Sequence, residues 1–447
     1  MKISRKKLEL LAPAGSVEKM KYAFAYGADA VYMGIPDFSL RVRINQFTMD
    51  HVKESIEYAH GLKKKIYVTV NIMAHNSHIE KLPPYLKKLN KWKPDALIVS
   101  DPGVIGMVKK YAPDLEIHLS TQANATNWQT VKFWHDQGLE RVVLGREVTL
   151  EELKEIHKKV PKCELEYFVH GAMCMSYSGR CMLSSWLAGR SANLGDCAQP
   201  CRWKYGVDCS DKKDKDCGFI EAEVEEPQRP GMKIPVEEDM HGTYIFNSKD
   251  MCFIEYLPEL IDAGVISFKI EGRAKSVAYL SSVVKAYREA FDYMNAEGAG
   301  RDLPVLKKRL RLIKKRVLDK LVHRGYTTGF LFGRDTVEQN VGDSHIGGEE
   351  EFVGEVVETQ NIASVQKSKK FKTTIRPHNA LRVGDKIRIM QPNQKDLRMT
   401  IKKMYNEKDV EAGQDLPIES GHGGTGKNIV IYTSREVEEF SILFKQS

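Results

Sequence analysis

The sequence lacks any apolar run approaching the roughly 20 residues that a membrane-spanning helix needs. The chain of 447 residues is 42% hydrophobic and 29% charged, a profile typical of globular proteins. Its first residues, Met1–Lys7, lead directly into a strand-like segment without the apolar core of a secretory signal. We therefore expect a cytoplasmic protein that has no membrane partner.

Two common protease motifs are also absent. The chain contains neither the H-E-x-x-H zinc motif nor the G-x-S-x-G nucleophile motif, so the usual zinc and serine protease machinery is not expected. A strong excess of one charge is missing too, because the formal net charge is only +8. That value does not by itself indicate a nucleic-acid partner, and the position of the charges matters more.

What the sequence does contain is a regular alternation of short apolar runs with amphipathic segments such as Met49–His60 and Leu150–Lys158. Near-continuous apolar strands separated by helices predict a parallel sheet covered on both faces, and their regular spacing favours a (βα)8-type TIM-like barrel. Ser267–Ile270 is the preferred eighth strand and Tyr244–Phe246 is the alternative. The seven runs are Leu8–Leu11, Ala30–Met33, Ile66–Val70, Ala96–Val99, Ile117–Ser120, Arg141–Leu144 and Leu165–Val169.

Polar side chains follow nearly every predicted strand, at the end of the barrel where such enzymes keep their chemistry. This pattern fits a polar or anionic substrate. Some of these residues could instead cap the next helix, and Ser16, Asp101 and Thr149 are candidates for that role. The residues at the predicted rim include Arg41, Arg43, Asn71, Gln122, Asn124, Arg146, His170, Glu271 and Arg273.

The domain boundaries follow from changes in composition and hydrophobic pattern along the chain. We expect a barrel over residues 1–298 with an insertion over 170–264, a basic helical connector over 299–340, and a C-terminal all-β barrel domain over 341–447. The insertion is far longer than an ordinary strand–helix connection, and its charged part, Cys209–Asp239, is expected to be flexible. Helices are predicted over Val277–Asn295 and Val305–Leu321, and C-terminal strands over Phe352–Glu358, Thr373–Arg376 and Lys386–Met390.

Four of the eight cysteines cluster in this insertion, at Cys174, Cys181, Cys197 and Cys201, with the spacing C-x6-C-x15-C-x3-C. In a reducing cytoplasm, clustered cysteines indicate metal binding rather than disulfides. Four thiolates suit either structural zinc or an iron–sulfur cluster, and the spacing does not decide between them. Buried cysteines that bind nothing are the plainer alternative.

The same region resembles peptidase family U32. The resemblance lies in Glu166–Cys174 and Gly179–Ser184, and further similar segments are Leu11–Gly15, Gly27–Tyr32, Asn247–Asp250, Lys269–Arg273 and His323–Phe330. The resemblance spans about Leu8 to Phe330. It implies an activity found in this family, the hydroxylation of RNA without molecular oxygen. The pattern is most similar to members that modify carbon 5 of the wobble uridine in tRNA, with prephenate as the hydroxyl donor.

The resemblance also implies a [4Fe–4S] cluster held by Cys174, Cys181, Cys197 and Cys201. Prephenate carries two carboxylates, so Arg41, Arg43, Arg146, Arg180 and Arg273 are candidate clamps, although each could equally form a structural ion pair. His170 and Glu271 are candidate proton-transfer groups, and Lys249 is a weaker candidate. A collagenase-like peptidase using Cys174 with His170, and a zinc-containing RNA-binding protein without catalysis, remain as alternatives.

Two basic segments bear on tRNA binding. The predicted helix Val305–Leu321 carries seven cations opposite its apolar face, which form either a phosphate-contacting ridge or a solvated surface. The segment Lys367–Lys372 places Phe371 among lysines, as proteins that bind single strands do. We expect the β domain to hold tRNA while the barrel receives a flipped anticodon base.

Overall fold

The structure, a computed structural model, describes most of the chain. The described residues are 8–39, 47–173, 183–188, 190, 197–198, 200–202, 220–225, 233–239, 242–244, 248–296, 302–333, 346–361, 371–411 and 416–446. No described helix is both long and apolar enough to cross a bilayer.

Eight parallel strands form a closed barrel, because β12 pairs with both the first and the seventh strand. The expectation that Ser267–Ile270 closes the barrel is confirmed. The alternative, Tyr244–Phe246, is wrong as the closing strand. Tyr244 belongs to β10 (Gly242–Tyr244), which pairs with the strand Lys233–Asp239 outside the barrel. The strands are β1 (Glu9–Pro13), β2 (Ala30–Gly34), β3 (Lys65–Val70), β4 (Ala96–Val99), β5 (Glu116–Leu119), β6 (Arg141–Val143), β7 (Glu164–Ala172) and β12 (Val265–Ile270).

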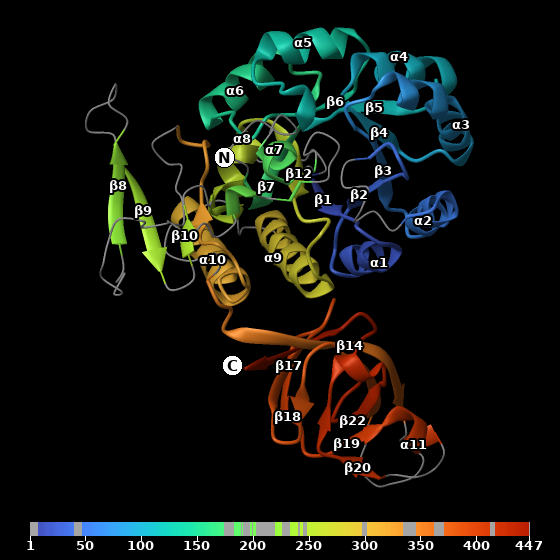
Figure 1. Cartoon of the computed structure of the whole chain (residues 1–447), viewed down its shortest axis with the longest axis vertical. Helices are drawn as coiled ribbons and strands as arrows, with labels where there is room; N and C mark the ends of the chain where they lie inside the picture. The colour runs from blue at the N-terminus through green and yellow to red at the C-terminus, as the bar shows by residue number, and fades with distance from the viewer. Residues whose placement is uncertain are drawn as a thin grey trace, which may run out of the picture.

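Helices surround this barrel (Figure 1). Ser16, Asp101 and Thr149 each accept a hydrogen bond from a backbone N–H in the first turn of the following helix, so their capping role is confirmed. The helices are α1 (Val17–Ala25), α2 (Met49–Gly61), α3 (Asn76–Trp92), α4 (Pro102–Tyr111), α5 (Trp128–Asp136), α6 (Leu150–Lys159), α8 (Leu257–Asp262) and α9 (Val277–Asn295).

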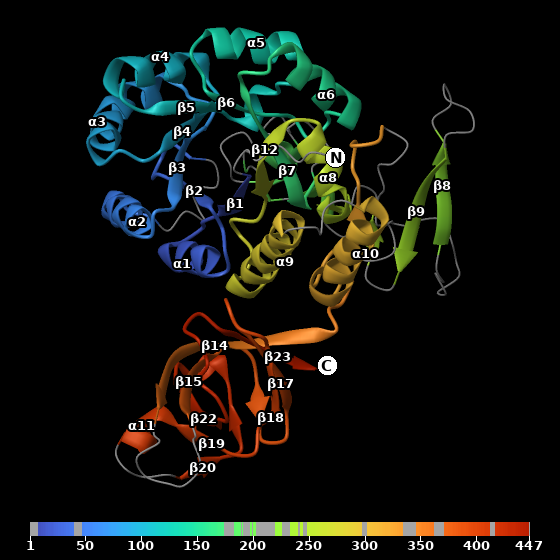
Figure 2. The ribbon, with the colours of Figure 1, turned by 180° about the vertical axis from the view of Figure 1, so that it is seen from behind.

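The long connection after β7 contains strands that the sequence did not predict. Its described part contains β8 (Ile220–Glu225) and β9 (Lys233–Asp239), which pair as an antiparallel ribbon beside the barrel (Figure 2). The expectation that Cys209–Asp239 is flexible stays a prediction, since the pairing of two strands does not test it. The chain then returns through β11 (Asp250–Cys252), which runs antiparallel to the end of β7 and pairs with β13 (Tyr326–Thr327).

The C-terminal domain is an eight-stranded antiparallel sheet with its own apolar core. In the described residues its end strands, β18 and β20, do not pair with each other, so the expected all-β domain has the form of a half-barrel. The order is β18 (Leu397–Thr400), β17 (Lys386–Met390), β23 (Ile442–Gln446), β14 (Glu350–Asn361), β15 (Phe371–Pro377), β22 (Ile429–Thr433), β19 (Met404–Asn406) and β20 (Pro417–Ile418). A separate pair, β16 (Leu381–Arg382) and β21 (Ser420–Gly421), and helix α11 (Glu407–Glu411) complete the domain.

The two domains are joined by buried polar contacts below α1 and α9 (Figure 1). The Tyr22 hydroxyl donates to Glu355 at 2.5 Å, and the Tyr26 hydroxyl donates to the Met390 carbonyl at 2.8 Å. Lys285 of α9 binds Asp396 at 3.0 Å. Because buried hydrogen bonds tolerate little relative motion, these contacts fix the C-terminal domain against the barrel.

Candidate functional site

The carboxyl ends of the barrel strands bring polar and charged side chains to one mouth. The sequence predicted this set from strand positions alone, and the closed barrel confirms that the strand ends share one rim. Predicted rim residues that the structure describes include Asn71, Gln122, Arg146, Glu271 and Arg273, and Ser120, which the sequence assigned to a strand, contacts Gln122.

One side of the mouth, formed by β6 and β12, is charged. Arg146 Nη2 lies 3.2 Å from Glu271 Oε2, with the two side chains 9% and 14% exposed. The Arg146 guanidinium also stacks 4.2 Å from the centre of the Phe168 ring. Stacking and the ion pair together hold this guanidinium in a fixed orientation.

Arg273 adds a second cation to the same side. Its guanidinium carbon lies 5.8 Å from the centre of the Tyr32 ring, and Nη1 lies 3.5 Å from Thr69 Oγ1. Two guanidinium groups over two aromatic rings can bind an anionic molecule that also has an apolar face. Arg41, Arg43 and Arg180, the other predicted clamps, lie outside the described residues.

The ends of β3 and β5 carry amide and hydroxyl groups, and Arg273 Nη1 lies 3.5 Å from Thr69 of β3. Asn71 Nδ2 donates to Gln122 Oε1 at 2.7 Å, and the Ser120 hydroxyl donates to the same oxygen at 3.1 Å. All three residues are at most 7% exposed. Among the described residues, the groups that bind Gln122 Oε1 are therefore uncharged.

A buried ion network lies below the mouth, inside the barrel. Arg141 contacts Glu9 at 2.5 Å and Glu166 at 3.2 Å, and Glu166 in turn contacts Lys269 at 2.7 Å. Lys269 also lies 4.4 Å from the centre of the Tyr32 ring, so the network reaches the floor of the mouth. Sequence analysis missed it, although charged residues inside otherwise apolar strands, as in Leu165–Val169, were a visible signal.

His170 lies outside the barrel rather than in the mouth. Its ring packs against Tyr279 and Tyr287 of α9 and Tyr326 of β13, with centroids 6.0, 5.6 and 5.7 Å away. Burial lowers the pKa of His170 to about 3, so the imidazole is neutral at physiological pH. The His170 ring and the Glu271 carboxylate thus have different neighbours, and the proton-transfer role of His170 stays a prediction. Lys249, the weaker candidate, is half-buried just before β11, and its stem passes Gly325.

Glycine allows the strand ends to approach closely at the mouth. Gly171 has φ +108°, and a Cβ atom there would lie 2.7 Å from the Glu271 carbonyl oxygen. The Glu271 N–H also donates to the His170 carbonyl at 2.8 Å. A side chain at position 171 would therefore both strain the backbone and displace the Glu271 segment.

Gly171→Ala is expected to destabilise the protein by about 3 kcal/mol, because it combines backbone strain with a steric clash. Gly138→Ala is the matched control, since Gly138 has φ +82° but open space around it. We expect only strain there, about 1 kcal/mol. Chemical denaturation of both variants measures the difference, and equal losses would show that the contact with Glu271 is unimportant.

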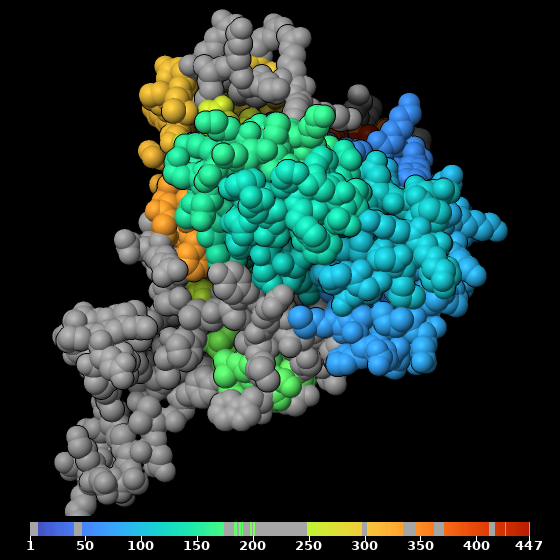
Figure 3. All heavy atoms as spheres, turned by 90° about the horizontal axis from the view of Figure 1, so that it is seen from above, coloured from blue at the N-terminus to red at the C-terminus, as the bar shows by residue number. Residues whose placement is uncertain are grey.

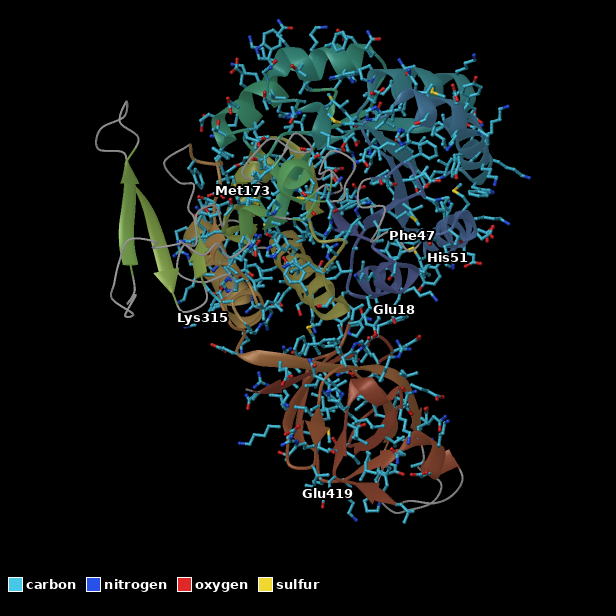
Figure 4. The ribbon with its side chains drawn as sticks, viewed as in Figure 1. Glu18, Phe47, His51, Met173, Lys315 and Glu419 are labelled. Atoms are coloured by element: carbon cyan, nitrogen blue, oxygen red, sulfur yellow. The ribbon has the colours of Figure 1, made fainter. Side chains whose placement is uncertain are left out.

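The cysteine loop begins directly after β7, at Met173, which Figure 4 labels beside the strand. Cys174 and Cys181 lie outside the described residues. Cys197 is exposed and Cys201 is half-buried, within a short segment whose Ala198 N–H donates to Ser184 of helix α7 (Leu183–Ala188) at 2.8 Å. Figure 3 shows this green segment at the molecular surface. Cysteine thiolates are the usual ligands of iron–sulfur clusters and of structural zinc, so Cys197 and Cys201 suit either group.

The predicted phosphate-contacting ridge is mostly neutralised within the chain. The helix is shorter than predicted, α10 (Leu303–Ile313) followed by a π-turn over Lys314–Leu318, and its buried face is confirmed by Leu306 and Leu310. Five of its seven cations contact carboxylates, and only Lys308 and Lys315 have none among the described residues; Figure 4 labels Lys315 on the outer surface. The plainer alternative, a structural surface, therefore describes most of this helix.

Cations without such partners occur instead on the C-terminal domain. Arg382, Lys402 and Lys403 line a pocket together with Glu419, which Figure 4 labels at the far end of the domain. None of the three cations forms an ion pair with a described residue. Such groups can accept phosphates without first breaking an internal ion pair.

Comparison with protein families bears out the resemblance seen in the sequence. The model described as "Peptidase family U32" matches residues 15–341. The model described as "Peptidase family U32 C-terminal domain" matches residues 349–443. The two matches correspond to the barrel with its connector and to the half-barrel.

Individual relatives differ in what they are named for. A protein of Escherichia coli K12 named "tRNA hydroxylation protein P" is 42% identical, covering 94% of this chain and 93% of its own. The "23S rRNA 5-hydroxycytidine C2501 synthase" of the same organism is 34% identical over 75% of this chain and 47% of its own. A protein of Porphyromonas gingivalis W83 named "Collagenase" is 35% identical over 64% of this chain and 65% of its own.

Proposed function

Because this chain belongs to peptidase family U32, and because it matches an RNA-hydroxylating relative over nearly its full length, we propose that it is an enzyme that hydroxylates tRNA. That full-length match is the observation that carries the proposal. The presence of both guanidinium and amide groups at the mouth supports it, since an RNA-modifying enzyme of this kind must hold both an uncharged base and a small charged donor.

The finer proposal concerns the reaction. The target is carbon 5 of the wobble uridine, the hydroxyl donor is prephenate, and molecular oxygen takes no part. Exchange of hydrogen for hydroxyl between the uracil carbon and the donor balances atoms and electrons. A [4Fe–4S] cluster held by Cys174, Cys181, Cys197 and Cys201 would supply redox-active or Lewis-acidic iron.

The residues of the mouth have separate tasks in this proposal. Arg146 and Arg273 bind the carboxylates of prephenate, because paired guanidinium groups over aromatic rings match a dicarboxylate with a ring. Glu271, 3.2 Å from Arg146, orients that guanidinium and is the ionisable group of the mouth that can take or give a proton. Tyr32 and Phe168 provide the apolar surface beneath.

The alternatives are less well supported. A peptidase using Cys174 with His170 requires a basic imidazole that substrate can approach, but the His170 side chain is buried and its pKa is held near 3 by that burial. A zinc-containing protein without catalysis would not need the paired charges of the mouth. Metal analysis separates it from the hydroxylase.

The test combines anaerobic purification with an assay of modified nucleosides. We expect a brown protein containing about four irons and four sulfides per chain. We also expect that the gene restores 5-hydroxyuridine in tRNA of a host that lacks the activity, only when the host makes prephenate. Stoichiometric zinc with no restored nucleoside would replace the proposal with the RNA-binding alternative, and cleavage of collagen peptides with no metal would favour the peptidase.

Neutralising Lys369, Lys370 and Lys372 together is expected to weaken tRNA binding and to flatten its dependence on salt. Lys372 is the second residue of β15, and the other two lysines lie outside the described residues. Each lost phosphate contact should reduce the slope of log K against log salt by about 0.7–0.9. Filter binding at several salt concentrations measures the slope. The double variant Lys308→Gln, Lys315→Gln is the comparison on the α10 ridge. An unchanged slope in the triple variant would show that Lys369, Lys370 and Lys372 do not contact tRNA.

A further inference from the structure

Gln122 has a buried hydrogen-bond donor that nothing in the described structure uses. The residue is 6% exposed, and its side-chain Nε2 makes no hydrogen bond with any described group. Buried donors in folded proteins are almost always paired, so an unpaired donor at the mouth is open to a hydrogen bond with a ligand.

The amide of Gln122 is held in one orientation. Its Oε1 accepts from Asn71 Nδ2 at 2.7 Å and from the Ser120 hydroxyl at 3.1 Å, which directs Nε2 away from both residues. Asn71 has the same inward strand parity as Tyr67 and Thr69, and Ser120 has that of His118. The donor therefore lies on the inner side of the mouth, between the ends of β3 and β5.

The amide and hydroxyl partners of Gln122 favour an uncharged ligand for this donor. The carboxylates of a small anionic donor are better served by the cations on β6 and β12. A pyrimidine base carries no charge and is recognised through the donors and acceptors on its edge. The β3–β5 side, with one free amide donor, is therefore the side that suits the base.

We propose that the Gln122 side-chain amide donates a hydrogen bond to the C4 carbonyl oxygen of the target pyrimidine and thereby selects uridine over cytidine. The assignment rests on the proposed function, in which carbon 5 reacts. Carbon 4 is its ring neighbour, so the C4 substituent lies beside the reacting position. In cytosine that substituent is an amino group, whose N–H would face the Gln122 N–H without an acceptor between them.

The test compares anticodon stem-loop RNAs with uridine or cytidine at the target position. Anaerobic binding measurements and nucleoside analysis after reaction each give a uridine-to-cytidine ratio. For the wild type we expect a preference of about 10- to 100-fold. Gln122→Met keeps the side-chain volume without the donor, and should reduce the preference to about 2-fold or less. Gln122→Glu offers an acceptor instead, and should favour cytidine. Gln137→Glu, at an exposed site after α5, is the matched control and should leave the ratio unchanged.

The outcomes separate this assignment from the proposed function. An active wild type with an unchanged ratio in both Gln122 variants would overturn the assignment alone. If the Gln122 variants bind prephenate more weakly but keep the uridine-to-cytidine ratio, the assignment is also overturned. The Gln122 amide would then bind the anionic donor and not the base. If the wild type neither binds nor modifies these RNAs, the proposed function fails and the assignment fails with it. Thermal unfolding of each variant shows that it is folded.

Discussion

Cys197→Ala is expected to abolish the iron–sulfur cluster and RNA hydroxylation while leaving both domains folded. The thiolate of Cys197 is one of four proposed ligands, and a cluster of this type is held by four. Because Cys197 is exposed, removing its sulfur leaves no cavity in a core. Iron content should fall from about four atoms per chain to nearly none, and the brown colour should be lost. Iron and sulfide analysis, with nucleoside analysis of tRNA, measures both effects.

The matched control is Cys163→Ala. Cys163 is buried beside the amino-terminal end of β7, and burial raises the pKa of its thiol to about 12, so it is a poor metal ligand at neutral pH. We expect this variant to keep its iron and its activity, at a modest cost in stability from the lost sulfur. An active and colourless Cys197→Ala variant would refute the cluster assignment.

Glu166→Gln is expected to have the largest effect on stability, about 3–5 kcal/mol. The carboxylate is fully buried and touches both Arg141 and Lys269. Its removal leaves Lys269 as a buried cation without its anion, and Arg141 then depends on Glu9 and Glu164. Lys269 lies on the floor of the mouth, so binding of the anionic donor should also change. Chemical denaturation measures the free energy of unfolding, with Glu151→Gln as the exposed control for which we expect less than about 0.5 kcal/mol.

The same carboxylate predicts how stability depends on pH. Burial alone would raise the pKa of Glu166, but Lys269 and Arg141 outweigh it and lower the pKa to about 2 from an ordinary value of 4.5. A lowered pKa in the folded state means that the contribution is complete above pH 4.5 and is lost as the pH falls toward 2. The difference between wild type and Glu166→Gln should therefore shrink over that interval. A constant difference would show that Glu166 is not ionised in the fold.

The sequence by itself determined the features that depend on local pattern. Seven strands, helix α9, the first C-terminal strands and the three helix caps follow from periodicity and from residue types at helix starts. The cysteine cluster was equally visible, because its members are close in the chain. The rim residues could be named in advance because parallel strands of a barrel end at the same rim.

Only the tertiary structure decided how distant residues pair. Arg141 and Glu9 are 132 positions apart and Lys269 and Glu166 are 103 apart, and no local pattern encodes such contacts. The position of His170 was likewise not encoded locally. An irregularity in the pairing of β7 with β12 changes the face on which its side chain lies, and so places the ring outside the barrel. The cations of α10 looked available in the sequence and are neutralised by carboxylates brought there by folding. Periodicity along the chain fixes which residues are buried, whereas the partners of a buried charge depend on which strands and helices become neighbours.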